Sequence, residues 1–229
     1  MHIGLIPDGN RRYMKKHGIF SLKDSYRAGI SKFYDFLEWS MKRGVKEVTI
    51  YALSMENIQN RGRREIDTLY TVFTEQAKKA LTDKRIHNNR IHINICGDRQ
   101  YLIGKGNTAL GKRLVESLEK LEDSTSKYSG FTLNFAMAYG GRQEIINAVK
   151  TAVSQCEEPS EENIRKNLWV KDDPEIVIRT SENRLSNFLL WQSAYSEMYF
   201  VDKLWQDFKE KDLDDILADY HSRERRFGK

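Results

Sequence analysis

The sequence predicts a single α/β domain in which helices flank a central, mostly parallel sheet of six strands. Short apolar and β-branched runs alternate along the chain with longer segments whose apolar residues recur at helical spacing. Strands that alternate with helices pair in parallel through right-handed crossovers. The 229 residues contain no internal repeat, low-complexity tract or linker, so residues 1–229 are expected to form one domain.

The first strand and helix are predicted from the stretch HIGLIPDGNRRYMKKHG. Its apolar start, residues 2–6, is typical of a buried strand, and Pro7 ends that strand because proline cannot donate to a sheet ladder. Gly9 permits a tight turn at no steric cost. Asn10 is the predicted N-cap of a helix over residues 11–17.

The later elements alternate in order. Apolar and β-branched runs predict the other strands at residues 46–53, 90–97, 131–138, 175–179 and 198–201. Helical spacing predicts helices at residues 21–43 and 64–84, one that ends near residue 122, and others at 141–152, 160–168, 186–195 and 212–226. The polar residues 54–62 are expected to form a loop.

The composition narrows the classes of function. No apolar run approaches the roughly 20 residues that a membrane helix needs, and no signal peptide is recognisable. Two cysteines predict no disulfide framework, so we expect a cytoplasmic protein. The net charge of +5 indicates an anionic partner. The basic residues do not alternate with aromatic ones as in a nucleic-acid groove, which favours a small phosphorylated ligand instead.

The turn after the first strand has the composition of an anion site. A helix N-terminus attracts anions, and Arg11 and Arg12 add positive charge beside it. Asp8 is out of place there unless a divalent cation lies between it and the anion. The combination predicts a diphosphate bound through Mg²⁺. The alternative is an ordinary surface turn followed by a solvated basic helix.

A second group of donors follows the fifth strand. Arg179, Arg184 and Ser186 crowd into one strand-exit loop, where two guanidinium groups suit phosphate oxygens. The alternative is that these arginines form surface ion pairs with Glu182 or with the acidic residues 172–173. Ligands of open α/β sheets bind at the carboxyl ends of the strands, which is where both groups are expected to lie.

Five segments resemble motifs of the cis-prenyltransferases, the undecaprenyl diphosphate synthase family. Residues 8–13 (DGNRRY) resemble its N-terminal signature, and residues 178–200 (IRTSENRLSNFLLWQSAYSEMYF) resemble its second hallmark. Residues 54–61 (SMENIQNR), 139–142 (YGGR) and 223–228 (RERRFG) are similar to further family motifs. The resemblance covers nearly the whole chain in unbroken order.

The resemblance implies an enzyme that condenses an allylic prenyl diphosphate with isopentenyl diphosphate, forming a cis prenyl diphosphate. It implies that Asp8 and Asn10 are catalytic and that Mg²⁺ is held by Asp8 and Glu197. The residues implied for the allylic diphosphate are Gly9, Asn10, Arg11, Arg12, Tyr26, Ser54, Asn57 and Arg61. Those implied for the acceptor diphosphate are Arg179, Arg184 and Ser186, with Arg226 and Gly228 acting on the partner subunit of a dimer.

The chain also departs from the family pattern. The loop between Arg179 and Arg184 is one residue shorter than the family's and has lost both of its glycines, so it is expected to adopt positive φ less freely. Tyr26 replaces a titratable imidazole. Leu53 and Ile58 replace aromatic residues. The donor half of the predicted site is thus intact, whereas the acceptor half is altered.

The growing prenyl chain would need an apolar tunnel. Candidates for its lining, which are otherwise ordinary core or dimer-contact residues, are Phe33, Phe36, Leu37, Trp39, Tyr70, Val72 and Phe73. Bulky side chains that face a tunnel would fill it and shorten the product, so a short- to medium-chain product is expected.

Three alternatives remain open at the level of sequence. The altered loop could admit another acceptor, such as a second allylic diphosphate or an alcohol. The chain could be a non-catalytic subunit of a heteromer, although such subunits lack the metal-binding aspartate that is present here as Asp8. A nucleic-acid-binding domain is the least favoured. A homodimer is expected, with contact to a membrane only through the lipid product.

Overall fold

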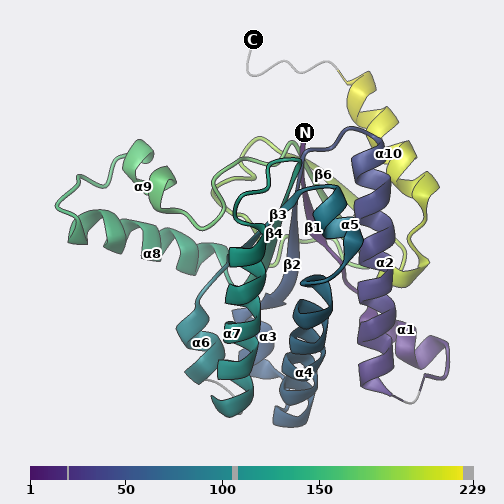
Figure 1. Cartoon of the computed structure of the whole chain (residues 1–229). Helices are drawn as coiled ribbons and strands as arrows, with labels where there is room; N and C mark the ends of the chain where they lie inside the picture. Colours follow the sequence, from purple (N-terminus) through teal and green to yellow (C-terminus); the bar gives the residue numbers. More distant parts are fainter. Residues whose placement is uncertain (20, 105–107, 224–229) are drawn as a thin grey trace.

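Six strands form one parallel sheet in the order β3-β4-β2-β1-β5-β6 (Figure 1). The computed structural model describes residues 1–19, 21–104 and 108–223. The strands are β1 (His2–Ile6), β2 (Glu47–Ser54), β3 (Ile91–Cys96), β4 (Phe131–Tyr139), β5 (Ile176–Thr180) and β6 (Glu197–Val201). The predicted six-stranded parallel sheet is confirmed. Its central strand, β1, is buried along its whole length, as its apolar sequence predicts.

Helices connect the strands from β1 to β5, as parallel pairing favours, whereas the irregular segment 181–196 joins β5 to β6. Between β1 and β2 lie α1 (Asn10–Lys16) and α2 (Leu22–Lys42). Next come α3 (Met55–Asn60), α4 (Arg63–Ala80) and α5 (Lys84–Asn88), followed by α6 (Arg99–Gly104) and α7 (Thr108–Thr125). The later helices are α8 (Gly141–Ser154), α9 (Glu161–Asn167), the 3₁₀ turn η1 (Trp205–Asp207) and α10 (Glu210–Ser222).

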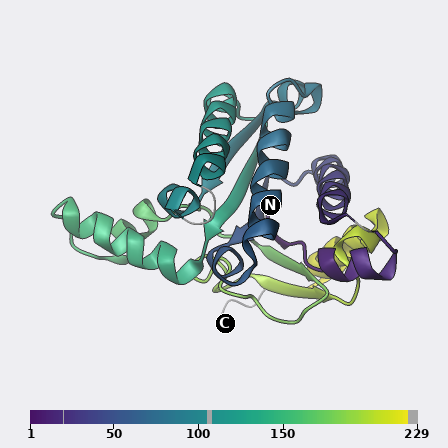
Figure 2. The same cartoon turned by 90° about the horizontal axis from the view of Figure 1, so that it is seen from below.

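The two faces of the sheet are covered differently. Helices α2, α4, α7 and α10 lie on one face (Figure 1) and share the main apolar core with strand residues such as Ile3 and Leu133. On the other face, Ile6, Cys96 and Val177 pack against Phe188 of the irregular segment 181–196. The pair α8 and α9 projects away from the sheet in two perpendicular views (Figures 1 and 2). Among the described helices, none has both the length and the apolar character that a membrane crossing requires.

The helix predicted at residues 186–195 is wrong. This segment forms a series of turns, in which Ser186, Asn187 and Leu189 have φ values of 50°, 64° and 45°. A helix cannot continue through residues in the left-handed region. The backbone of Asn187 is instead held by α8, because its carbonyl accepts a 2.7 Å hydrogen bond from Gly141 N.

Three smaller predictions also differ from the structure. Residues 54–62 are not simply a loop, because Ser54 caps α3 by accepting from Asn57 N at 2.9 Å. Asn10 is not the N-cap of α1 but its first helical residue; Gly9 takes the cap position with φ of 111°. The helix predicted at residues 64–84 ends earlier, at Ala80, and the separate short helix α5 follows it.

Candidate active site

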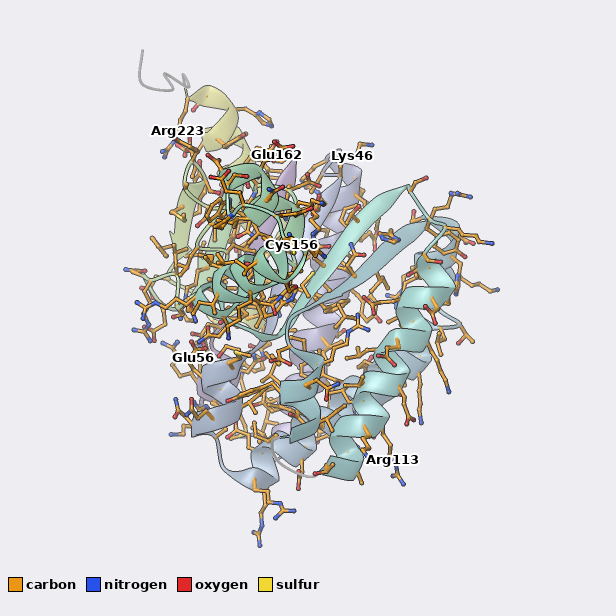
Figure 3. All side chains as sticks on the ribbon, turned by 90° about the vertical axis from the view of Figure 1, so that its left-hand side faces the viewer. Lys46, Glu56, Arg113, Cys156, Glu162 and Arg223 are labelled. Carbon is orange, nitrogen blue, oxygen red and sulfur yellow. The ribbon has the colours of Figure 1, made fainter. Side chains whose placement is uncertain are left out.

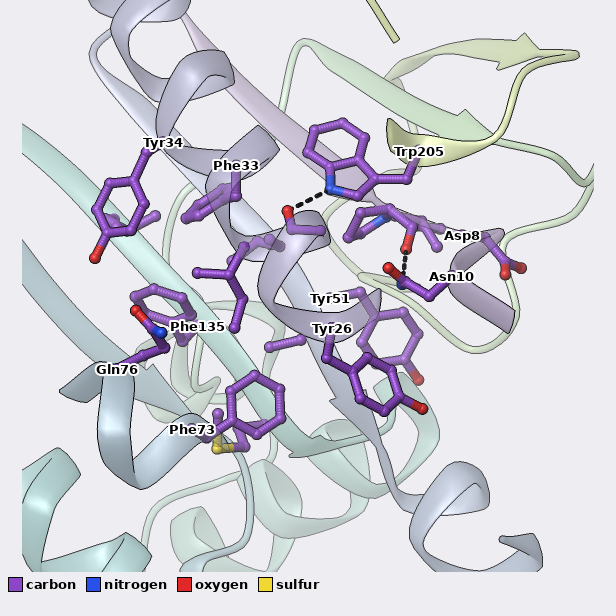
Figure 4. A pocket seen from close by; sticks show the side chains of 18 of the residues that line it. Asp8, Asn10, Tyr26, Phe33, Tyr34, Tyr51, Phe73, Gln76, Phe135 and Trp205 are labelled. Carbon is purple, nitrogen blue, oxygen red and sulfur yellow. Dashed lines mark hydrogen bonds between the residues drawn. The ribbon is translucent and has the colours of Figure 1, made fainter. Parts of the chain in front are cut away.

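A cavity of about 1380 Å³ lies between the sheet and helices α2 and α4 (Figure 4). It begins at Asp8, just beyond the carboxyl end of β1, and reaches Ile91, the first residue of β3. Because all the strands are parallel, Asp8 lies at the carboxyl ends of the strands and Ile91 lies at their amino ends. The cavity therefore runs the length of the strands. Its walls are mainly apolar and include Ile30, Phe33, Leu37, Leu69, Val72, Phe73, Ile93, Leu133 and Phe135.

Only part of the predicted lining faces this cavity. Phe33, Leu37, Val72 and Phe73 line it without filling it. Phe36 is fully buried elsewhere, with its ring centroid 5.8 Å from that of Trp205. The other predicted residues outside the lining are Trp39 and Tyr70.

The turn between β1 and α1 fixes Asp8 at the mouth of the cavity. Asp8 N donates to Thr180 Oγ1 at 2.9 Å, and Asp8 Oδ1 accepts from Gly9 N at 2.6 Å. Only glycine suits the next position: a Cβ on Gly9 would lie 2.8 Å from Ser181 Oγ, and φ there is 111°. The turn holds the Asp8 carboxylate 39% exposed, accessible from the cavity.

The arginines that follow the turn also line the cavity. Arg12 lies 3.9 Å from Asp8 Oδ1 and 3.1 Å from Glu182 Oε1, and it donates to the Ser181 carbonyl at 3.1 Å. Arg11 is more exposed, with one nitrogen 4.0 Å from Glu65 Oε2. The two guanidinium groups are thus positioned by acidic side chains and remain within reach of an anion.

Tyr26 joins this side of the mouth through a network that includes a residue the sequence reasoning missed. The Tyr26 hydroxyl donates to Glu65 Oε1 at 2.7 Å and accepts from Arg61 Nη1 at 2.8 Å. Burial raises the pKa of Tyr26, so the phenol stays protonated at neutral pH. Glu65 could have been found from its i,i+4 spacing to Arg61, which it contacts at 3.1 Å.

Ser54 and Asn57 lie at the start of α3 and line the same mouth. Between them, Glu56 accepts a 2.7 Å hydrogen bond from Asn187 Nδ2. This bond connects the side of the site that is predicted to hold the allylic diphosphate to the segment after β5. Glu56 and Asn187 both line the cavity, and neither was among the predicted ligands.

Arg179 connects the two halves of the site. It is 3% exposed, and its Nη2 donates to Asp8 Oδ2 at 3.0 Å. Its Nη1 donates to Ser186 Oγ at 2.6 Å and to the Arg184 carbonyl. Its Nε is buried without a hydrogen-bond partner among the described groups. A buried, incompletely satisfied guanidinium beside a cavity is suited to an anion.

The short loop between Arg179 and Arg184 adopts the geometry that its lost glycines would have favoured. Ser181 has φ of 70°, and its hydroxyl donates to the Lys203 carbonyl at 2.8 Å. Glu182 lies 3.1 Å from both Arg12 and Arg184. In this structure, Glu182 therefore neutralises one arginine from each half of the site.

The structure does not bring Glu197 to Asp8 within one chain. Glu197 pairs in register with Ile176, whereas Asp8 contacts Thr180 at the other end of β5. Four strand residues correspond to about 13 Å. Glu197 instead contacts Arg223 at 3.1 Å. Figure 3 shows Arg223 near the top of the molecule, well separated from the cavity-lining Glu56.

Two other predicted ligands, Arg226 and Gly228, lie outside the described residues. Within residues 1–19, 21–104 and 108–223, no three His, Cys, Asp or Glu side chains form a group that could hold a metal. Mg²⁺ nevertheless needs few protein ligands, because it keeps water and takes oxygens from substrate phosphates. The single exposed carboxylate of Asp8 fits that mode of binding.

The sequence matches the family model Prenyltransf, described as undecaprenyl diphosphate synthase, over residues 6–228. A tritrans,polycis-undecaprenyl-diphosphate synthase (geranylgeranyl-diphosphate specific) from Pyrobaculum aerophilum is 40% identical, with 100% of this chain and 95% of the relative aligned. An isoprenyl transferase from Thermus thermophilus is 39% identical, over 100% of this chain and 88% of the relative.

Solved structures share the fold. A lavandulyl diphosphate synthase from Lavandula x intermedia, solved with dimethylallyl diphosphate, superposes with a TM-score of 0.85 at 30% identity and covers 100% and 98% of the two chains. A probable undecaprenyl diphosphate synthase from Campylobacter jejuni gives a TM-score of 0.80 at 28% identity, with the same coverage.

Proposed function

The chain belongs to the undecaprenyl diphosphate synthase family, and we propose that it condenses an allylic prenyl diphosphate with isopentenyl diphosphate to form a cis prenyl diphosphate. The observation that carries this proposal is the Asp8–Arg179 pair, at 3.0 Å, at the mouth of a long apolar cavity. This pair joins two groups of cationic side chains. Two anionic head groups beside one apolar tail match that arrangement. Residues 1–229 act as one catalytic domain in this proposal.

The allylic diphosphate is proposed to bind on the α1 side of the mouth. Arg11 and Arg12 are available there on α1, and the Tyr26 hydroxyl holds Arg61 at 2.8 Å. These groups stabilise the charge that develops on the pyrophosphate as the C–O bond breaks. The backbone and side chains that complete this half are Gly9, Asn10, Ser54 and Asn57.

Mg²⁺ is proposed to be held by Asp8 together with diphosphate oxygens. Bound there, the cation would neutralise charge on the leaving diphosphate. Asp8 is kept in place by Gly9 N and Arg179, so its carboxylate does not need to reorganise when the cation arrives. Glu197 could contribute only from the partner subunit of a dimer, because it lies at the other end of the strands within its own chain.

The acceptor diphosphate is proposed to bind at Arg179, Arg184 and Ser186. Bound there, isopentenyl diphosphate would place its double bond beside the allylic carbon, and this proximity accounts for much of the acceleration. The pyrophosphate leaves with the electron pair of the C–O bond. The π electrons of the acceptor form the new C–C bond, and the acceptor then loses one proton, which the released pyrophosphate can take, so that a double bond is restored.

The growing chain is proposed to extend into the apolar cavity. Phe33 and Phe135 meet edge to face there, with ring centroids 5.8 Å apart, and leave room along the strands. The volume of about 1380 Å³ exceeds that of a typical drug-sized site. A medium-chain product therefore fits better than a short one.

A homodimer is proposed as the working assembly. The edge strand β6 presents Phe200, which is 42% exposed, and Tyr195 just before it is 88% exposed. The projecting α8 exposes Ile146 and Val153. Burying these apolar side chains against a second copy would also let Glu197, Arg226 and Gly228 reach a neighbouring site. We expect the enzyme to act in the cytoplasm and to meet a membrane through its lipid product.

A second candidate function is the coupling of two allylic diphosphates. It is favoured by the shortened loop between Arg179 and Arg184, which alters the acceptor half. The lavandulyl diphosphate synthase structure, which holds dimethylallyl diphosphate, also has this fold. This reaction would use the same donor half and leave the cavity largely unused.

Mass spectrometry of the products distinguishes the two functions. The purified protein would receive Mg²⁺ and allylic diphosphates of several lengths, with and without isopentenyl diphosphate. Products that grow by five-carbon steps only when isopentenyl diphosphate is present would support the condensation. Coupled products formed in its absence would support the second function, and no product with any donor would contradict both.

A further inference from the structure

Gln206 lies directly behind Asn10, outside the cavity. It belongs to η1, between β6 and α10, and its Nε2 donates to Asn10 Oδ1 at 2.6 Å. Asn10 lines the cavity, whereas Gln206 is not among the lining residues. Gln206 can therefore affect a bound substrate only through Asn10.

The backbone carbonyl of Ser25 supports the orientation of both amides. Gln206 Nε2 also lies 3.4 Å from the Ser25 carbonyl, which can only accept a hydrogen bond. In this arrangement the amide nitrogen of Gln206 faces this corner, and Asn10 presents its oxygen there. The Asn10 backbone carbonyl is itself held by Ser25 Oγ at 2.8 Å, which anchors the start of α1 to α2.

This orientation leaves the other end of the Asn10 amide available to a ligand. The nearest acceptor to Asn10 Nδ2 is the Pro7 carbonyl at 3.5 Å, a long contact (Figure 4). An amide nitrogen carries two N–H groups, so at least one of them is free for an oxygen in the cavity. If the amide were reversed, an acceptor would take its place and would repel a diphosphate.

The corner depends on the absence of a side chain at Gly29. A Cβ on Gly29 would lie 2.5 Å from Asn10 Oδ1 and 3.4 Å from Gln206 Nε2, so the absence of a side chain at Gly29 creates the space that both amides occupy. Trp205 anchors η1 on two sides, because its Nε1 donates to the Gly29 carbonyl at 2.8 Å and its backbone N donates to the Asp8 carbonyl at 3.0 Å.

We propose that Gln206 is a positioning residue: it fixes the Asn10 amide so that its N–H groups face the diphosphate of the allylic substrate. The inference rests on the proposed function and deepens it, because it assigns Asn10 the role of a hydrogen-bond donor to the leaving group. Charge on that group increases as the C–O bond breaks, so the contact strengthens in the transition state.

The test compares two substitutions of one side chain with a neighbouring control. Gln206→Met keeps the length of the side chain and removes the donor, and Gln206→Glu replaces the donor with an acceptor. Both are expected to lower kcat by about 10- to 100-fold, because a preorganised donor is lost or reversed. The KM for isopentenyl diphosphate should stay within about twofold of the wild-type value, and the melting temperature within about 2 °C.

The control is Asp207→Asn, which breaks the 3.2 Å contact between Lys16 and Asp207 in the same turn without touching Asn10. It should retain wild-type kcat. Unchanged kcat in both Gln206 variants would overturn the inference. So would a loss of kcat that the control shares, or one that is matched by a fall in melting temperature, because that would reveal a purely structural role.

A binding measurement separates this inference from the proposed function. An allylic thiodiphosphate, which ionises poorly, would be titrated by calorimetry. The Gln206 variants should bind it about three- to fivefold more weakly than the wild type and the control do. If this pattern appears but the wild-type protein makes no product, the proposed function fails while the positioning of Asn10 stands. Equal binding by all four proteins would contradict the positioning role.

Discussion

At the scale of single residues, Glu182 occupies a place that a substrate phosphate would otherwise take. Its two oxygens lie 3.1 Å from Arg12 and 3.1 Å from Arg184. These arginines belong to opposite halves of the site. An incoming diphosphate must therefore compete with this carboxylate for both guanidinium groups.

Replacing Glu182 by Gln should relieve that competition. Removal of the negative charge is expected to lower the KM for isopentenyl diphosphate by about two- to fivefold, the modest size expected of exposed ion pairs. Steady-state kinetics would measure it. Asp173→Asn is the matched control, because Asp173 pairs with Arg165 at 2.8 Å away from the cavity. A KM that rises in the Glu182 variant would show that the carboxylate binds the substrate through a cation instead.

A second residue-scale prediction concerns Glu47, at the amino end of β2 and remote from the mouth. Burial raises the pKa of Glu47 to about 7, although Asn134 Nδ2 donates to it at 2.6 Å. Since the folded state holds the proton more tightly than the unfolded state, Glu47 weakens folding progressively as pH rises from about 4.5 to 7. Glu47→Gln removes this dependence.

Thermal unfolding at pH 5 and pH 8 would measure the effect. The Glu47→Gln variant should gain stability over the wild type at pH 8, on the order of 1–3 kcal/mol, and little at pH 5. His2 lies beside Glu47 and should have the opposite pH dependence. Burial lowers the pKa of His2 to about 4, so the folded state disfavours its charged form and His2 destabilises the fold only in acid. Identical pH profiles for the variant and the wild type would contradict the assignment.

At the scale of elements, the two faces of α2 make different contacts. Phe33 faces the cavity, whereas Phe36 packs between Trp205 and Phe208. Both phenylalanines belong to one amphipathic pattern, so the sequence could not separate them. The distinction depends on η1, whose position no local pattern predicts.

Alanine substitutions in α2 should therefore have unlike effects. Phe33→Ala is expected to lengthen the product by at least one five-carbon unit, because it widens the cavity, and to lower stability as well, because Phe33 is only 5% exposed. Phe36→Ala should destabilise the fold by about 3–5 kcal/mol and leave the product length unchanged. Product analysis and denaturant unfolding would measure the two effects. A longer product from Phe36→Ala alone would reverse the assignment of these faces.

Some elements could be predicted from the sequence, whereas one could not. The sequence patterns of β1, α2 and β4 are strong, because the spacing of their apolar residues fits only one kind of secondary structure in each. The segment 186–195 also has helical spacing, yet it forms turns. Its backbone is held by hydrogen bonds to distant elements, such as Gly141 N to the Asn187 carbonyl at 2.7 Å, and tertiary contacts of this kind leave no local signal.

At the scale of the whole molecule, the predicted carboxyl end of the sheet gathers residues from the ends of β1, β2 and β5 and from the segment that follows β5. The sequence order and the parallel sheet bring Asp8, Ser54, Asn187 and Arg179 to one mouth. The contacts that connect them were beyond the sequence reasoning. Asp8 with Arg179, and Glu65 with Tyr26, are pairs separated by 171 and 39 residues. The position of Glu197 relative to Asp8 could not be predicted from the sequence either, because it depends on strand register.

The assembly is testable at this scale. Light scattering should find a dimer, and Phe200→Glu should shift it to a monomer, because a charge would be placed in the apolar patch of β6. The monomer is expected to lose most of its turnover if Glu197, Arg226 and Gly228 act across the interface. Lys127→Glu, an exposed residue on the loop before β4, is the control. A monomeric wild type with full activity would rule the dimer out.

Asp8 and the arginines around it are proposed to form a site that joins two diphosphate substrates. Incorporation of labelled isopentenyl diphosphate into lipid-extractable product tests it most directly, with wild type and Asp8→Asn compared at saturating Mg²⁺. Steady incorporation by the wild type is expected, with a loss of about 100-fold or more in the variant and retention of its fold. Equal incorporation by the two proteins, or none by the wild type, would contradict it.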